Sequence, residues 1–172
     1  MKRQSQAAQI AYSAILGAVS LVLVYIASVV PSGAWGIVAV AGLFPAAAII
    51  SVGLKAGLLC WAGVSVLAFL LLPGKFCALL FAALFGLYPI IKALIERLRR
   101  TVPEYILKLA FFNAVFTVIY LLMSGAVLDS LPKQLGVTWI FYLVGNIVFL
   151  IYDFGFSKLI NVYVARIGRA VK

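Results

Sequence analysis

Hydrophobic residues along this chain form long runs separated by short polar or turn-forming stretches. Six runs stand out, at 10–30, 35–53, 55–72, 75–95, 105–127 and 136–160. Each is close to the ~20 residues that an α-helix needs to cross the ~30 Å hydrocarbon core of a bilayer. The pattern therefore predicts an all-α integral membrane protein, a compact bundle of six transmembrane helices.

Proline, glycine and polar residues mark the breaks between these runs. Typical turn sequences occupy 31–33, 73–74, 101–103 and 129–132. The break at 52–55 is the weakest, so the second and third runs are predicted to form either a tight hairpin or a longer bent element. Pro45 and Pro89 lie inside runs and should kink their helices. Lipid tolerates a kink only where neighbouring groups satisfy the freed carbonyls.

Composition supports a membrane location and a single domain. Of the 172 residues, 66% are hydrophobic and 10% are charged. A water-soluble fold of this size could not bury so much apolar surface, so lipid must solvate most of the chain. We expect residues 1–172 to form one transmembrane domain. The first run follows Lys2 and Arg3, as in a signal peptide, but its ~20 residues favour a retained helix.

The distribution of Lys and Arg predicts the orientation. Of the fourteen basic residues, only Lys75 and Lys133 fall on one side of the six-helix arrangement. The other twelve share the side that holds both termini: Lys2, Arg3, Lys55, Lys92, Arg97, Arg99, Arg100, Lys108, Lys158, Arg166, Arg169 and Lys172. By the positive-inside rule, both termini are cytoplasmic. The net charge of +10 then favours contact with anionic lipid or an acidic partner rather than nucleic acid.

The reactive side chains give little support to catalysis. The chain has no histidine, and its four carboxylates show no spacing typical of acid–base pairs or metal sites. Cys60 and Cys77 lie in different runs without a metal or redox spacing, so we expect two buried thiols. Phosphate-loop and dinucleotide fingerprints are absent. We therefore expect no enzyme activity, no metal and no cofactor.

A few polar residues interrupt the fifth and sixth runs. Asn113 lies in the fifth run, and Asn146 and Asp153 lie two helical turns apart on one face of the sixth. Because unsatisfied polar groups are costly in lipid, this face should point into the bundle. The chain places Asp153 within reach of three lysines, Lys92, Lys108 and Lys158, so a buried ion pair is the default expectation. Asn146 suits either interhelical hydrogen bonding or contact with a ligand.

Aromatic residues gather toward the predicted outer side. Trp35, Tyr120, Trp139 and Tyr142 fit an interfacial belt. Trp139, Tyr142 and Asn146 are also spaced by three and four residues, so they form one helical stripe. That stripe could form the wall of an outward-facing ligand pocket.

Two further features suggest a partner protein. Ala7/Ala11 and Ala14/Ala18 are small-residue pairs at spacing four, which let another helix approach closely, either inside the bundle or outside it. The cytoplasmic connection after the fourth run carries Arg97, Arg99 and Arg100, with Glu96 and Arg100 spaced to pair on a continuing helix. Such an exposed pair contributes only ~0.3–0.5 kcal/mol, so orientation and lipid or partner contact explain the charge better.

The chain resembles the substrate-binding S components of energy-coupling factor transporters, which take up vitamins in prokaryotes. The resemblance rests on the size, the six helices, the cytoplasmic termini and the alanine pairs of "QAAQIAYSAILGAVS". It implies a location in the prokaryotic cell membrane and a transmembrane coupling protein, attached to two ATPases, that docks on the four alanines. It also implies a small-molecule ligand near residues such as Trp139, Tyr142 and Asn146.

The alternative is a membrane scaffold of the rod-shape-determining type, which has similar length and helix count and transports nothing. The few polar residues inside the helices favour it, because a vitamin pocket normally offers several convergent hydrogen-bonding groups. A lipid-handling protein is a third possibility that fits the cationic cytoplasmic side.

Overall fold

The structure is a computed structural model, which describes residues 6–98, 100–127 and 135–170. Helices and short turns account for these residues, and no strand occurs among them. The chain divides into two compact units, residues 1–97 and residues 98–172, called here unit 1 and unit 2. Each unit is described by itself, and one closed bundle of all six helices stays a prediction.

Six helical segments of the described chain are long and apolar enough to cross a membrane. They span Gln6–Val29, Ala34–Ser51, Leu54–Leu71, Lys75–Leu98, Val102–Leu122 and Tyr142–Ala165. The predicted all-helical chain with six apolar helices is therefore confirmed. Insertion into a membrane and the cytoplasmic placement of the termini stay predictions.

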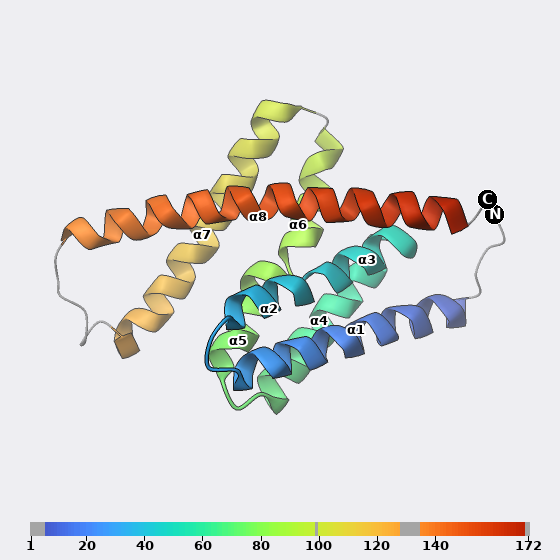
Figure 1. Ribbon diagram of the computed structural model, residues 1–172, viewed down its shortest axis with the longest axis horizontal. Helices are drawn as coiled ribbons and strands as arrows, with labels where there is room; N and C mark the ends of the chain where they lie inside the picture. Colours follow the sequence, from blue (N-terminus) through green and yellow to red (C-terminus); the bar gives the residue numbers. More distant parts are fainter. Residues whose placement is uncertain (1–5, 99, 128–134, 171–172) are drawn as a thin grey trace. The chain divides into compact units, whose positions relative to one another are not determined.

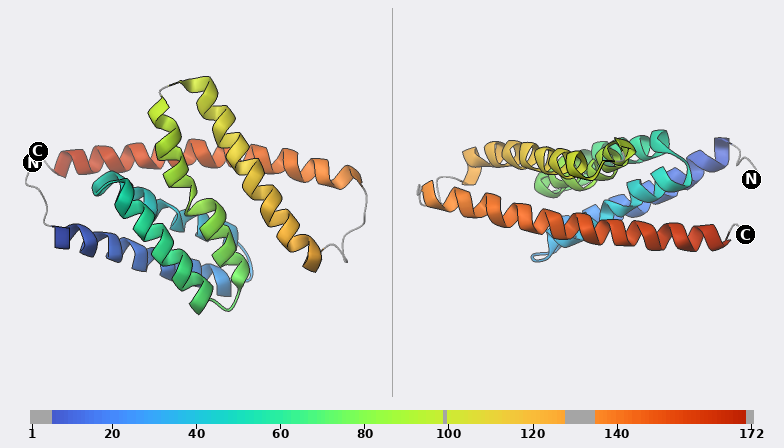
Figure 2. Two further views of the ribbon diagram at one scale, coloured as in Figure 1. Left: turned by 180° about the vertical axis from the view of Figure 1, so that it is seen from behind. Right: turned by 90° about the horizontal axis from the view of Figure 1, so that it is seen from above.

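In unit 1, the first helix runs along one side and contacts four other elements (Figures 1 and 2). Helix α1 packs against α2, α3, α4 and α5. The elements of the unit are α1 (Gln6–Val29), α2 (Ala34–Ala41), α3 (Leu43–Ser51), α4 (Leu54–Leu71), α5 (Lys75–Leu80), the π-helix η1 (Phe81–Phe85) and α6 (Tyr88–Ile95), and the 3-10 turn η2 (Glu96–Leu98) leads into unit 2. Four of these elements therefore pack against one mostly apolar helix, on the face that is buried.

Small residues on α1 allow this close packing. The buried face of α1 consists of Ser13, Gly17, Ser20, Val24 and Ala27. A Cβ atom on Gly17 would lie 3.5 Å from Val64 Cγ2 and 3.6 Å from Cys60 Sγ, which is ordinary contact with α4. Close approach of backbones over small residues is the usual source of helix association in lipid.

The second and third spans form a hairpin, which decides between the two forms predicted for residues 52–55. Helix α3 ends at Ser51, α4 begins at Leu54, and the two helices pack together. Gly53 has φ 128°, a backbone conformation that a residue with a Cβ rarely adopts. Glycine at this position therefore makes the tight reversal possible.

The second span is broken halfway, next to Pro45. Proline lacks the N–H that would bond to the carbonyl four residues earlier, which is that of Ala41. The helix stops at Ala41 and resumes at Leu43, and the Ser20 hydroxyl donates a hydrogen bond of 3.0 Å to the Ala41 carbonyl. The predicted kink at Pro45, with its freed carbonyl satisfied by a neighbour, is confirmed.

The fourth span is irregular in the same way. It contains the π-helical segment η1, followed by a turn and then α6, with Pro89 in the first turn of α6. The Trp61 indole N–H donates a hydrogen bond of 2.9 Å to the Ala82 carbonyl of η1. A Cβ atom on Gly42 would lie 2.3 Å from the Phe85 carbonyl oxygen, so only glycine permits this approach. The two irregular points therefore face each other inside unit 1.

Unit 2 is a pair of long helices, α7 (Thr101–Val127) and α8 (Leu135–Ala170). The helices cross and contact each other (Figure 2). Helix α8 has 36 residues, or ~54 Å at 1.5 Å per residue, so it is longer than the ~30 Å hydrocarbon core. Phe112 stacks on Phe149 and Phe116, with ring centroids 4.5 and 5.5 Å apart. These aromatic rings contribute apolar packing to the contact.

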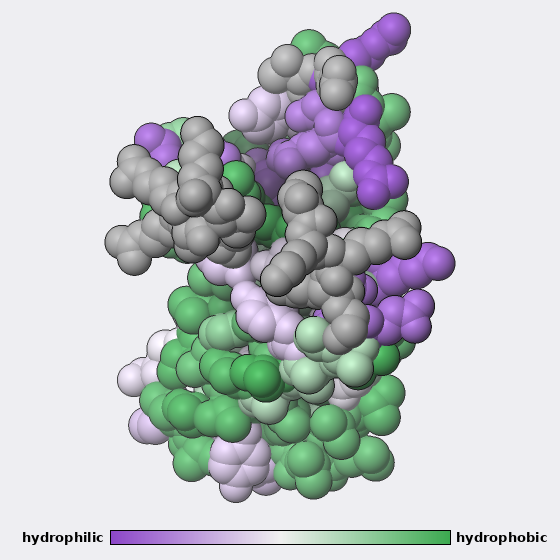
Figure 3. Space-filling view, turned by 90° about the vertical axis from the view of Figure 1, so that its right-hand side faces the viewer, coloured by the Kyte–Doolittle hydropathy of each residue, from purple (hydrophilic) through white to green (hydrophobic). Residues whose placement is uncertain are grey.

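The charged connection between α6 and α7 differs from the sequence prediction. Helix α6 ends at Ile95 and a 3-10 turn follows, so Glu96 and Arg100 do not share a continuing helix. Glu96 instead pairs with Lys92 at 2.9 Å, and the Arg100 carbonyl accepts the Glu104 N–H at the start of α7. In Figure 3, hydrophilic residues gather in the upper part of the face shown, the level at which Figure 1 places this connection.

Candidate functional site

Polar side chains form a ladder along the contact between α7 and α8. Its first rung is the ion pair between Lys108 Nζ and Asp153 Oδ2, 3.4 Å apart. Lys108 is 6% exposed and Asp153 is 6% exposed. Of the three lysines considered for Asp153, the structure pairs it with Lys108 on the neighbouring helix. A buried charge on an apolar helix requires such a partner.

The second rung is a pair of asparagines. Asn113 Nδ2 donates to Asn146 Oδ1 at 2.9 Å, and Asn146 Nδ2 donates back to Asn113 Oδ1 at 3.1 Å. Each Nδ2 also donates to a backbone carbonyl one turn earlier, that of Leu109 and that of Tyr142 respectively. Both amides are therefore engaged within the pair of helices, as expected for interhelical hydrogen bonding.

The third rung joins Thr117 and Tyr142, whose hydroxyl oxygens lie 2.7 Å apart. Thr117 also hydrogen-bonds the Asn113 carbonyl on its own helix. Phe116 packs edge-on against the Tyr142 ring, with centroids 5.2 Å apart. The ladder thus runs from a charged rung through an amide rung to a hydroxyl rung. We name it the α7–α8 ladder: Lys108, Asn113, Thr117, Tyr142, Asn146 and Asp153.

The aromatic residues proposed for ligand binding are only partly brought together. Tyr142 and Asn146 belong to the α7–α8 ladder, while Trp139, on the same stripe of α8, is 81% exposed. Tyr120 is half-buried on α7. Trp35 lies on α2 in unit 1, 58% exposed, with its ring 5.9 Å from that of Phe76. We call Trp139, Tyr142 and Asn146 the α8 stripe, since these three proposed ligand residues share one face of one helix.

The small residues of α1 divide into two faces. Ser13, Gly17 and Ser20 are buried, whereas the alanines at 7, 11, 14 and 18 are exposed. We call Ala7, Ala11, Ala14 and Ala18 the alanine stripe. Its exposure leaves this face open, and the internal packing of α1 uses the neighbouring face instead.

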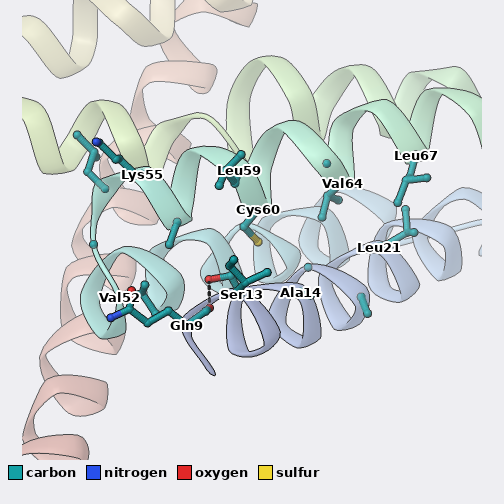
Figure 4. A pocket seen from close by; sticks show the side chains of 17 residues that line it. Gln9, Ser13, Ala14, Leu21, Val52, Lys55, Leu59, Cys60, Val64 and Leu67 are labelled. Atoms are coloured by element: carbon teal, nitrogen blue, oxygen red, sulfur yellow. Dashed lines mark hydrogen bonds between the residues drawn. The ribbon is translucent and has the colours of Figure 1, made fainter. Parts of the chain in front are cut away.

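The alanine stripe borders an apolar groove between α1 and α4, with a volume of about 800 Å³, and two of its alanines also line that groove (Figure 4). Ala14, Ala18 and Leu21 line it from α1, and Leu59, Val64 and Leu67 line it from α4. Gln9 and Lys55 lie at one end. We call this feature the α1–α4 groove. Sequence reasoning missed it, because a groove between two helices depends on how they cross.

The cationic residues near the α6–α7 connection have different environments. Arg97 and Arg100 are exposed, and Arg99 lies outside the described residues. Lys92 is 2% exposed, paired with Glu96, and its Nζ lies 5.9 Å from the centre of the Tyr88 ring. The exposed arginines remain available for lipid headgroups or a partner, whereas Lys92 belongs to the interior of unit 1.

Within the described residues, no group of three or more His, Cys, Asp or Glu side chains could hold a metal ion. Cys60 and Cys77 are both buried as free thiols, on α4 and α5. The Cys77 thiol contacts the Ala27 carbonyl at 3.5 Å.

Comparisons with known proteins add no family to this description. No protein-family model, no curated protein and no solved structure matches the chain. The functional assignment therefore rests on the residues and contacts described above.

Proposed function

We propose that this chain is a membrane-embedded binding subunit that takes up a small micronutrient together with a separate coupling protein and ATPases, like the S components it resembles. The observation that carries the proposal is the exposure of the alanine stripe. Four alanines at helical spacing form a smooth strip on which a partner helix can pack closely. In S components, the corresponding alanine face docks on the coupling protein.

On this proposal, the ligand binds toward the outer side against the α8 stripe. Trp139 offers an exposed indole on the face that also carries Tyr142. The amide of Asn146 is engaged by Asn113 and the Tyr142 carbonyl, so a ligand would contact mainly aromatic surface. We therefore expect a largely apolar or aromatic small molecule.

The second candidate is a non-transporting membrane scaffold, which the α7–α8 ladder favours. Its polar side chains hydrogen-bond one another, so the described part of unit 2 offers few polar groups for a ligand. A scaffold also requires an exposed docking face, so the alanine stripe fits both candidates. The two differ in whether a small molecule is bound.

The test begins with the purified full chain. Mass spectrometry under native conditions should detect a retained small molecule, and Trp139→Ala should lower its affinity while leaving partner recovery unchanged. Ala7→Trp and Ala11→Trp should abolish recovery of a transmembrane partner and leave ligand binding intact. Ala62→Trp, at an exposed alanine of α4, is the matched control.

The outcomes separate the candidates. Recovery of a membrane partner without any retained small molecule would favour the scaffold. Unchanged partner recovery in Ala7→Trp and Ala11→Trp would remove the main support for the coupling role.

A further inference from the structure

The α1–α4 groove has one polar end and an otherwise apolar lining (Figure 4). Lys55 is the only charged residue among the described residues that line it, and Gln9 lies at the same end. Leu21 and Leu67 lie at the opposite end. Lys55 follows the turn between two membrane spans, so the polar end lies where the helices reach the membrane surface.

The charge at this end is positive from two sources. Lys55 is exposed, and α4 begins beside it at Leu54. No side chain of the described chain caps this helix start, so its first amide groups keep the partial positive charge of a helix N-terminus. The polar end is therefore suited to an anionic group such as a phosphate.

The length of the groove matches one leaflet of a bilayer. From Lys55 to Leu67 is twelve residues along α4, or ~18 Å at 1.5 Å per residue. One leaflet accounts for about half of the ~30 Å hydrocarbon core. An acyl chain that starts at the surface spans this depth, whereas a partner transmembrane helix would continue across the second leaflet.

Small residues make the groove deep enough to hold a chain. Ala14, Gly17 and Ala18 line it from α1, and Gly63 lines it from α4. A Cβ atom on Gly63 would have no neighbour within 4 Å, so the space in front of this glycine is open. The volume of about 800 Å³ falls in the usual range of small-molecule sites, roughly 300–1,000 Å³.

We propose that the α1–α4 groove binds an anionic phospholipid, with one acyl chain lying along the groove and the phosphate against Lys55 and the first turn of α4. The apolar lining would bury the chain, and the lysine would select the charged headgroup. This inference does not rest on the proposed function, because a binding subunit and a scaffold would both carry the site.

The experiment is a lipid titration of the full chain in mild detergent, followed by native mass spectrometry. The probes are phosphatidylglycerol and phosphatidylcholine with identical acyl chains, so only the headgroup charge differs. We expect phosphatidylglycerol to bind about fivefold more tightly, since a basic residue near the membrane surface contributes ~1 kcal/mol.

Two variants separate the headgroup from the acyl chain. Lys55→Gln should remove the preference for phosphatidylglycerol and leave phosphatidylcholine binding unchanged, while Lys75→Gln should keep the preference. Gly63→Leu should weaken both lipids by about tenfold or more, because the new side chain occupies the space of at least two CH₂ groups at ~0.8 kcal/mol each. Gly36→Leu is the matched control, since its Cβ also has open space but lies outside the groove.

Ala18→Leu fills the groove from α1 and keeps the test valid if Gly63→Leu does not fold. Equal affinity of the wild-type chain for the two lipids would overturn the proposal. So would equal lipid affinity of Gly63→Leu and Gly36→Leu. The proposal would also be overturned if Gly63→Leu lost a helical protein partner but bound lipid as before, because the groove would then be a protein-binding site.

Discussion

Units 1 and 2 hold their helices together by different means. Unit 1 packs several helices over small residues, and buried side chains donate hydrogen bonds to backbone carbonyls of other helices, as Ser20 does to Ala41. Unit 2 joins two helices through side chains that bond one another, as Asn113 and Asn146 do. In lipid, both close packing and interhelical hydrogen bonds can drive association.

The two units differ in how many backbone groups lack a hydrogen-bond partner within their own helix. The helical segments of unit 1 that contain Pro45 and Pro89 are irregular, which leaves backbone carbonyls without their usual helical partners. Neighbouring side chains therefore donate hydrogen bonds to the backbone. Helices α7 and α8 have continuous backbone hydrogen bonding over the described residues, which leaves their polar side chains available to each other. Four experiments test this contrast.

The largest effect is expected at the charged rung of unit 2. Lys108→Met leaves the Asp153 carboxylate buried without its partner, which should cost about 3–5 kcal/mol of unfolding free energy. Denaturant titration of the protein in bicelles measures this loss. Lys158→Met, which removes an exposed lysine near the Phe154 ring, is the control and should cost much less. Equal losses in the two variants would contradict a structural role for the ion pair.

The next effect tests close packing in unit 1. Gly42→Ala places a Cβ atom 2.3 Å from the Phe85 carbonyl oxygen, so the backbone must move. We expect a loss of about 1–3 kcal/mol, seen as a lower midpoint of thermal unfolding in detergent. Gly36→Ala on the same span has open space and should be neutral or stabilising. If both variants behave alike, the approach of Gly42 to Phe85 is not required.

A smaller effect is expected when the side chain that satisfies the backbone is removed. Ser20→Ala takes away the donor to the Ala41 carbonyl, which should destabilise unit 1 by about 1 kcal/mol. Ser28→Ala is the control, because Ser28 is bonded to the Tyr25 carbonyl of its own helix in an exposed position. Chemical denaturation of both variants gives the comparison. A larger loss in Ser28→Ala would argue against the role of Ser20.

The smallest effect is the coupling within the amide rung. A double-mutant cycle with Asn113→Leu and Asn146→Leu should give an interaction energy of about 0.6 kcal/mol, the mean for hydrogen bonds between membrane helices. The control is a second cycle that combines Asn113→Leu with Asn161→Leu, because Asn161 is exposed. A coupling near zero for the first cycle would make the ladder a by-product of apolar packing.

The sequence was sufficient to predict six long apolar helices, because runs of ~20 apolar residues can be read directly from it. It also anticipated the freed carbonyl at Pro45, since the missing N–H is a property of proline itself. It did not identify Ser20 as the donor, because that contact joins residues 21 positions apart on separate helices. The same limit applies to the pairing of Glu96, which has basic residues four positions away on both sides.

The candidate site shows the same limit. Spacing put Tyr142 and Asn146 on one face of a helix, and the structure shows which α7 residues they meet. Spacing also described the alanines of α1 as small, but only packing separates the exposed alanine stripe from the buried face next to it. Whether a helix face is exposed depends on tertiary packing. Small residues occur on both faces of α1, so their spacing alone does not predict which face is buried.

The π-helical segment η1 has a consequence for the register of the fourth span. A π-helical turn accommodates one residue more than an α-helical turn, so residues after Phe85 are rotated by ~100° relative to an uninterrupted α-helix. Lys92 and Tyr88 lie after this insertion, and both are buried. Removing one residue from η1 would turn both side chains away from their present neighbours. The extra residue in η1 therefore rotates α6 about its axis. Which face of α6 is buried is then independent of which face is buried in the helix before η1.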